Sequence, residues 1–211
     1  MTPGDTAAFD HEWARFESWL SAHSPADRAA LRGPADPEGI AALESRLGFA
    51  LHPELRRLLE LHDGAAHPVA PPGSSPLPAG AFLPLGHRLS GLDDIAMMHK
   101  ILVEIGEDLI ETGLWNDEDV AGHLHMCVPI ALPDDGGVAF VDHRPGPSYG
   151  HVYEMGIGSG DLDGTLWATG PAELFRSLAD SLETGSLFLY YRPSTYAGGS
   201  GHQCVEWDIE H

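Results

Sequence analysis

The chain has 211 residues, 43% of them hydrophobic, which is enough for one sizeable core, so we expect a single domain. It carries 32 acidic against 11 basic side chains, a formal net charge of −21. This balance argues against nucleic acid or an anionic membrane as a partner, because both require basic surface. Such a charge most often serves only to keep the surface solvated, and its functional interpretation is attraction of a basic protein partner by electrostatic steering.

The number of cysteines and the composition of the N-terminus indicate in which cellular compartment the protein resides. Cys127 and Cys204 are too few for a disulfide scaffold. The first residues, Met-Thr-Pro-Gly-Asp, contain neither a basic region nor an apolar run, and no stretch reaches the roughly 18 apolar residues of a membrane helix. We therefore expect a soluble protein of the reducing cytoplasm.

The N-terminal quarter is predicted to be helical. One aromatic and aliphatic stripe marks a first helix that should stop before Pro25: Phe9, Trp13, Phe16 and Leu20. Ser24-Pro25 and Asp36-Pro37 each resemble an N-cap followed by proline at the first helical position.

Residues 40–64 are the strongest helical pattern in the chain and predict two helices around a tight corner. Gly48 stands where the first should end, Pro53 opens the second, and Asp63-Gly64 should close it. We expect the leucines of this pair to pack against a later sheet.

The next stretch combines a loop, a short strand and a long helix. Residues 65–80 are rich in proline, glycine and serine and predict a surface loop. Residues 82–85 predict an extended piece at a sheet edge. Ser90 is the expected cap of a helix that runs towards Gly113 with its apolar residues directed at the sheet.

After an acidic segment at 116–119 the hydrophobic period changes from 3.6 to 2, which predicts an antiparallel meander. Residues 126–132 and 138–140 alternate around the turn Asp134-Asp135-Gly136-Gly137, and a third strand follows at 151–155. The leucines of residues 40–64 should face the alternating set Val128, Ile130, Val138 and Phe140.

The C-terminal part predicts a glycine-rich loop at 156–164, a short strand at 166–168 and a helix from Thr169 or Pro171 that ends at Gly185. Residues 187–191 are apolar. The segment from Arg192 onward is polar, with no clear pattern.

Several of these pieces resemble the signatures of the SUKH superfamily, which is named after yeast cell-wall-assembly regulators. They are Leu-Glu-x-x-Leu-Gly, Leu-x-Pro-Glu-Leu and Asp-Gly within residues 43–64, Val-Pro-Ile-Ala at 128–131, the Asp-Asp-Gly-Gly turn, Val141-Asp142, Gly-His-Val at 150–152, Trp167-Ala168 and the helix around Leu174-Phe175. The resemblance spans about residues 9–185. The loop after Gly64 is longer than the resemblance leads us to expect, and it does not account for the tail.

The resemblance implies an α+β fold, with helices packed on a mostly antiparallel sheet, in one domain over residues 9–192 followed by a polar tail at 193–211. It also implies a protein-binding role without catalysis or cofactor, since bacterial members are similar to immunity proteins that neutralise toxins. A regulatory scaffold of the cell envelope is an alternative. Fold by itself does not fix function.

The sharpest enzyme-like signal is the pair His123 and His125, two positions apart at the expected start of a strand. On a strand, both imidazoles would share a face and, with His151 or Asp142, could hold zinc in a hydrolase. No third ligand is fixed by spacing, so we predict no metal site and keep the metal-dependent hydrolase as an alternative.

For a binding module, the contact residues should project from turns of the sheet, as an aromatic anchor ringed by charge. The predicted partner-binding residues are Trp115, Asp117, Glu118, Asp119, Asp134, Asp135, Asp142 and His143. Acids such as Asp134 and Asp135 are also ordinary turn residues before Gly136-Gly137.

Overall fold

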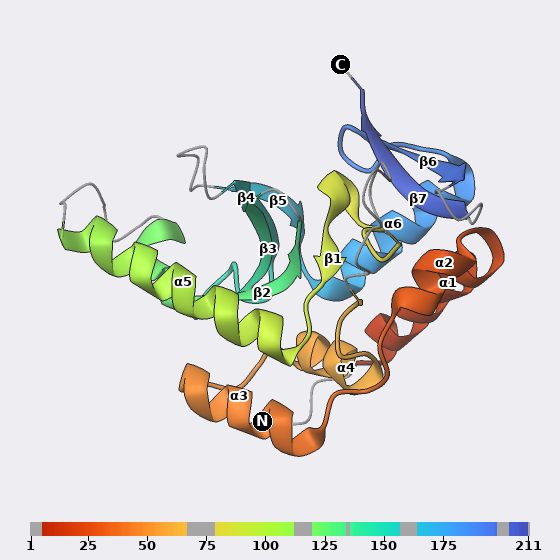
Figure 1. Ribbon diagram of the computed structural model, residues 1–211. Helices are drawn as coiled ribbons and strands as arrows, with labels where there is room; N and C mark the ends of the chain where they lie inside the picture. The colour runs from red at the N-terminus through yellow and green to blue at the C-terminus, as the bar shows by residue number, and fades with distance from the viewer. Residues whose placement is uncertain are drawn as a thin grey trace, which may run out of the picture.

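The computed structural model describes residues 6–66, 79–111, 120–133, 136–156, 164–197 and 203–210. It is an α+β arrangement, as expected: a five-stranded antiparallel sheet has helices on both faces, and a separate two-stranded hairpin lies beside it (Figure 1). Most of the predicted loop at 65–80 and of the glycine-rich loop at 156–164 lies outside the described residues.

The N-terminal helices form where the sequence predicts them: α1 (Ala7–His23), α2 (Pro25–Ala30), α3 (Pro37–Leu47) and α4 (Pro53–Leu61). The predicted stripe of α1 is buried. Asp36 caps α3 by accepting a hydrogen bond from the Glu38 N–H. Ser24 precedes α2 but does not cap it, because its hydroxyl donates to the buried Asp27 carboxylate at 2.5 Å.

The corner between α3 and α4 is confirmed at Gly48, which has a left-handed φ of 83°. The end of α4 is two residues earlier than expected, at Leu61, with His62 already extended. Gly64 has a φ of 71° and serves a close approach, since a Cβ there would lie 2.4 Å from the Gly91 nitrogen.

The edge strand of the sheet is shifted from its predicted place. Residues 84–86 form a short 3-10 turn, η1 (Pro84–Gly86), and the strand is the following β1 (Arg88–Leu89). Pro84 lacks the N–H that a strand pairing would use, so the chain turns there before it pairs. β1 then joins β2 with Leu89 opposite Ala131.

Helix α5 (Leu92–Glu111) forms as predicted, but its capping residues differ. The Leu92 N–H donates to Asp63 Oδ1 at 2.8 Å, and the Gly91 N–H donates to Asp94 Oδ2 at 3.0 Å. The Ser90 hydroxyl takes no part. A side chain from the end of the helical pair thus starts a helix much later in the chain.

The meander is confirmed as β2 (Cys127–Leu132), β3 (Gly137–Asp142), β4 (Val152–Gly156) and β5 (Thr165–Ala168), in the order β1-β2-β3-β4-β5. The register shifts between Pro129 and Ala131, which leaves Ile130 as the extra residue of a bulge. Residues of β2 and β3 are buried on both faces.

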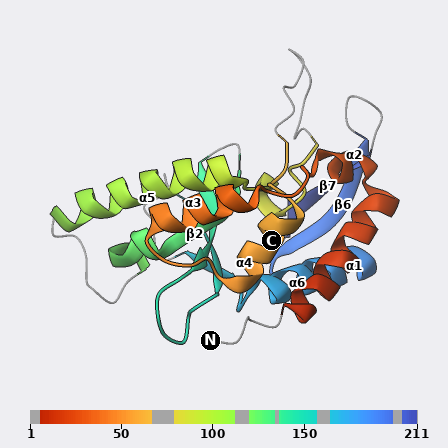
Figure 2. The ribbon, with the colours of Figure 1, turned by 90° about the horizontal axis from the view of Figure 1, so that it is seen from below.

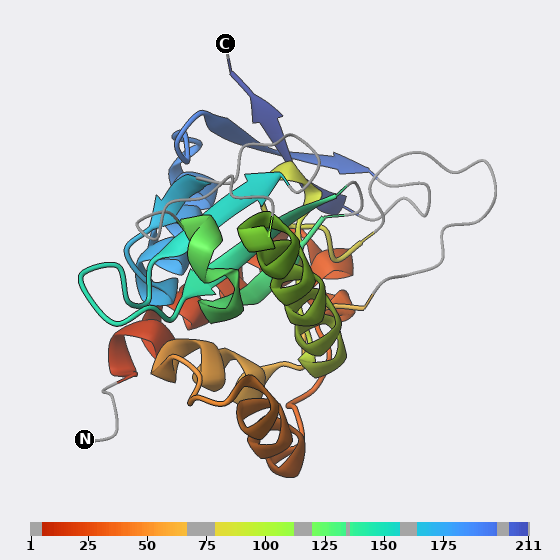
Figure 3. The same ribbon diagram turned by 90° about the vertical axis from the view of Figure 1, so that its left-hand side faces the viewer.

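The two faces belong to two cores, and this corrects one expectation. Val128 and Ile130 pack in the main core with Leu55 and Leu58 of α4. Val138 and Phe140 lie on the opposite face, in a smaller core beneath Leu102 of α5 and η2 (Val120–Met126). Cross-strand partners share a face, and Val128 pairs with Val141 rather than with Val138 or Phe140. Figure 3 shows α5 lying across the sheet.

Helix α6 (Pro171–Thr184) ends at Gly185, as predicted, with a φ of 72°. It lies alongside α1, where Phe175 contacts the rings of Phe9 and Trp13 (Figure 2).

The polar C-terminal segment contains a hairpin that the sequence patterns did not predict: β6 (Tyr191–Ala197) and β7 (Gln203–Ile209). Only its inner side is apolar, with Val205 and Trp207 in the main core. The Trp207 indole donates to the Phe82 carbonyl at 2.9 Å. Most other side chains of the hairpin are exposed or half-buried, and many of them are polar, which is why the sequence pattern did not indicate strands.

Among the described helices, none has both the length and the apolar character required to cross a membrane.

Candidate functional site

The predicted contact residues divide into two groups. Trp115, Asp117, Glu118, Asp119, Asp134 and Asp135 lie outside the described residues. Asp142 and His143 are described, at the end of β3. The structure therefore locates two of the eight predicted residues, and these two are neighbours in the chain.

Asp142 is fully buried and organises the loop that follows it. Its carboxylate accepts hydrogen bonds from both Nε and Nη2 of the Arg144 guanidinium, of which the Nη2 bond is 2.7 Å, and another from the Arg144 backbone N–H at 2.8 Å. Its carbonyl accepts from Gly150 N–H at 2.7 Å, which closes the loop over residues 143–150. The pairing raises the pKa of Arg144 and holds this guanidinium in place.

His143 is also buried, at 3% exposure, and joins the loop to α4. Its Nε2 accepts the backbone N–H of His52 at 2.8 Å, and its Nδ1 therefore donates to the Val141 carbonyl at 2.9 Å. This neutral tautomer fits the environment, because burial lowers the pKa of His143 from 6.5 to about 4.

A histidine, a tyrosine and a glycine complete this region, and the sequence patterns did not single out the first two. The His52 ring lies 5.1 Å from the Tyr149 ring. Gly150 has a φ of 90°, and a Cβ there would lie 2.6 Å from His52 Nε2, so only glycine fits. Tyr149 is 42% exposed, which makes it the aromatic group that the loop presents to solvent. In the sequence, His52 is the variable position of the Leu-x-Pro-Glu-Leu motif.

We call residues 142–151 the Asp142 loop. A cavity of about 400 Å³ lies beside it, and its lining includes Arg144, Ser148, His123 and His125. A fixed guanidinium and two imidazoles thus surround one hollow, and the same loop carries the exposed Tyr149. Such a surface can take part in polar and aromatic contacts with a protein.

His123 and His125 belong to the 3-10 segment η2, not to the start of a strand as expected. Their ring centres are nevertheless 6.0 Å apart. Burial, followed by the nearby His123 and His99, lowers the pKa of His125. Within the described ranges, no group of at least three histidine, cysteine, aspartate or glutamate side chains is placed to hold a metal ion.

The two residues considered as a third ligand are engaged elsewhere. Asp142 is paired with Arg144, and His151 Nδ1 lies 3.4 Å from the Tyr153 hydroxyl.

Comparison with known protein families identifies a family for most of this chain. A sequence model of the SMI1 / KNR4 family (SUKH-1) matches residues 34–184, which include α3 to α6, the five-stranded sheet and the Asp142 loop. No curated protein matches the chain.

Proposed function

Because the chain belongs to the SMI1 / KNR4 family (SUKH-1), we propose that it is an immunity-type protein, which binds and neutralises a toxin domain with a basic surface and catalyses no reaction. The family match over residues 34–184 is the observation that carries this proposal. Protein binding is the common feature of the roles that this family suggests, and the toxin is our more specific inference.

The charge of the chain supports a basic partner. A formal charge of −21 on 211 residues creates a negative potential over much of the surface. Such a potential speeds the encounter with a positively charged protein by roughly 10 to 1,000-fold and slows the encounter with a negatively charged one.

The contacts are assigned to two kinds of residue. Trp115, Asp117, Glu118, Asp119, Asp134 and Asp135 stay our proposed contact residues. Asp142 and His143 are buried, so we assign to them the support of the Asp142 loop. Tyr149, which this loop exposes, is added as an aromatic contact residue.

The direct test measures binding to a toxin domain encoded by a neighbouring gene, where the genome holds one. The association rate should fall steeply as salt is raised from about 0.01 to 0.15 M, because screening shortens the reach of the surface charge. Binding whose association rate does not change with salt would remove the steering argument. Failure to bind that toxin, together with co-purification of cell-envelope proteins, would favour the scaffold alternative.

The contact surface is tested with a matched pair of tyrosines. Tyr149→Ala should weaken binding by about tenfold or more, as loss of an aromatic contact does at an interface centre. Tyr190→Ala removes a side chain of nearly equal exposure, 41% against 42%, from the turn before β6 and should leave affinity unchanged. Equal effects of the two substitutions would place the interface elsewhere.

The close approach of His123 and His125 keeps the metal-dependent hydrolase as a second candidate. Elemental analysis of protein purified without an affinity tag decides it. Stoichiometric zinc that is lost on His125→Ala would favour the hydrolase over the immunity protein.

A further inference from the structure

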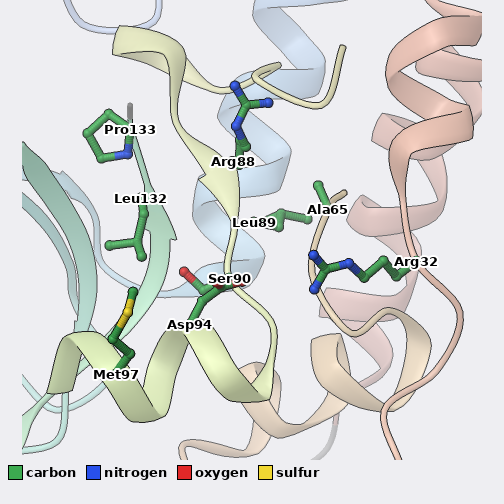
Figure 4. Close-up of a pocket in the computed structure, with 9 residues that line it drawn as sticks. All are labelled: Arg32, Ala65, Arg88, Leu89, Ser90, Asp94, Met97, Leu132 and Pro133. Carbon is green, nitrogen blue, oxygen red and sulfur yellow. The ribbon is translucent and has the colours of Figure 1, made fainter. Parts of the chain in front are cut away.

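A second cavity, of about 500 Å³, lies against the edge strand β1, and its lining includes none of the residues of the Asp142 loop. Its walls come from the segment after α2, from β1, from the first turns of α5 and from the end of β2 (Figure 4). This volume is in the range of sites for small organic ligands.

One wall of this edge-strand cavity is basic. Arg32 forms no ion pair with any residue of the described ranges, and its Nη1 makes only a long contact of 3.5 Å to the Asp63 carbonyl. Most other arginines pair with carboxylates, as Arg15 does with Glu183 and Arg57 with Asp10. In so acidic a chain, an arginine left without a carboxylate beside a cavity is available to an anion.

A second arginine and a hydroxyl line the same cavity. The Arg88 side chain is buried and donates to the Ala79 carbonyl at 3.2 Å. Ser90 is 5% exposed, and its hydroxyl has no hydrogen-bond partner in the described part of the chain. A buried hydroxyl without a partner costs free energy, and that of Ser90 lies just behind the cavity wall, between the two arginines and the start of α5.

The opposite wall is apolar. Met97, Leu132 and Pro133 line it, and Met97 is 55% exposed although it is a large apolar side chain. Figure 4 shows these three side chains on one side and Arg32 on the other, with Ser90 and Asp94 between them.

The walls are held by backbone hydrogen bonds between distant segments. The Arg32 N–H donates to the Gly64 carbonyl at 3.0 Å, and the Ala65 N–H donates to the Leu89 carbonyl at 2.9 Å. The Asp94 carboxylate, the acidic group among the lining residues, is engaged by the Gly91 N–H at the start of α5. The site is therefore formed before a ligand arrives, which reduces the entropic cost of binding.

We propose that the edge-strand cavity binds a small ligand in which a carboxylate stands beside an apolar group. The carboxylate would pair with the Arg32 guanidinium, which offers two parallel N–H donors, and the apolar group would cover Met97 and Leu132. Two sources share this chemistry, namely a free N-acylated amino acid and the C-terminal residue of a peptide.

Titration calorimetry separates these sources with the full chain and four probes: N-acetyl-leucine, N-acetyl-Ala-Ala-Leu and the C-terminal amide of each. Both acids should bind more tightly than their amides, by about tenfold or more, because a charge-assisted pair is lost in the amide. Binding of the tripeptide acid alone assigns the site to peptide ends, and similar binding of both acids assigns it to the free amino acid derivative. Equal binding of acid and amide, or no binding of any probe, overturns the proposal.

Two variants test whether the ligand binds in this cavity. Arg32→Ala should weaken binding of the acids by about tenfold and leave the amides unaffected, whereas Arg46→Ala, which removes another exposed arginine on α3 away from the cavity, should change neither. Both arginines are exposed, so both variants should fold. An unchanged affinity in Arg32→Ala would contradict the assignment even if the acids bind.

Discussion

His143 is a buried imidazole with a backbone partner at each ring nitrogen, one an acceptor and one a donor. Protonation of Nε2 would place a second N–H against the His52 N–H, so the charged form loses a hydrogen bond as well as its hydration. Burial is the larger cause of the lowered pKa of about 4, and the Val141 carbonyl opposes it. The side chain therefore links the Asp142 loop to α4 only while it is neutral.

This arrangement predicts a pH dependence of stability. The unfolded chain binds a proton at His143 near pH 6.5 and the folded chain only near pH 4, so the unfolded state is favoured as pH falls through this window. The contribution of His143 is fully present above pH 6.5 and is lost towards pH 4, with a slope of at most about 1.4 kcal/mol per pH unit. Urea denaturation at several pH values measures it.

His143→Gln is the matched variant for this measurement, because the amide does not titrate. It should be less stable than the parent above pH 6.5, and its stability should fall less between pH 6.5 and pH 4. Equal slopes for variant and parent would mean that other groups, such as His52, whose pKa is also lowered by burial, account for the effect.

At the scale of elements, α4 joins the helical layer to the sheet. Leu55, Leu58 and Leu59 are nearly fully buried in the main core. Its N-terminal end also makes two hydrogen bonds. The Glu54 carboxylate accepts the Ala172 N–H of α6 at 2.9 Å, and the His52 N–H donates to His143 Nε2. Burial raises the pKa of Glu54. The packing of the leucines holds α4 in place, and the hydrogen bonds at its N-terminal end orient it.

Leu58→Ala should destabilise the fold by about 2 to 5 kcal/mol, because it leaves a cavity in the main core, to which Val128 and Ile130 also belong. Denaturant unfolding measures the loss. Leu187→Ala is the control, since Leu187 is 41% exposed and its removal should change stability by less than about 0.5 kcal/mol. Partner affinity of the folded Leu58→Ala protein should be unchanged. A large loss of affinity at unchanged stability would show that Leu58 belongs to a binding surface.

At the scale of the whole molecule, the buried Asp27 carboxylate connects the first helices to the last strand. It accepts the Ser24 hydroxyl at 2.5 Å, the Gly80 N–H at 2.7 Å and the Val205 N–H at 2.7 Å. One side chain of α2 thus fixes a turn and the hairpin that lies 178 positions further on. A buried carboxylate is tolerated here because these donors satisfy it.

Asp27→Ala should cost at least about 2 kcal/mol, because the N–H groups of Gly80 and Val205 lose their acceptor in a buried site. Amide hydrogen exchange should also become faster in β7. Asp36→Ala removes an exposed carboxylate with a contact of 3.4 Å and should cost about 1 kcal/mol or less. Unchanged exchange in β7 would show that the hydrophobic contacts of Val205 and Trp207 hold the hairpin without Asp27.

The helices and the meander could be predicted from the sequence because their determinants are local. The stripe of α1, the glycines after α3 and α6, and the alternation of β2 and β3 each lie within one segment. Local patterns also placed Asp142 and His143 at the end of a strand. The net charge and the order of the family signatures were likewise readable without a structure.

Only the tertiary structure decided features that join segments far apart. The register of β2 against β3 places Val128 opposite Val141, and alternation within each strand does not reveal this register, so it could not assign Val138 and Phe140 to the second core. Asp63 caps α5, His52 is the partner of His143, and Arg32 lines a cavity. Each of these contacts joins residues that are far apart in the chain, so the sequence around each residue does not reveal it. Short-range periodicity reports which face of an element is buried, but the long-range contacts that build a site are fixed only when the elements pack.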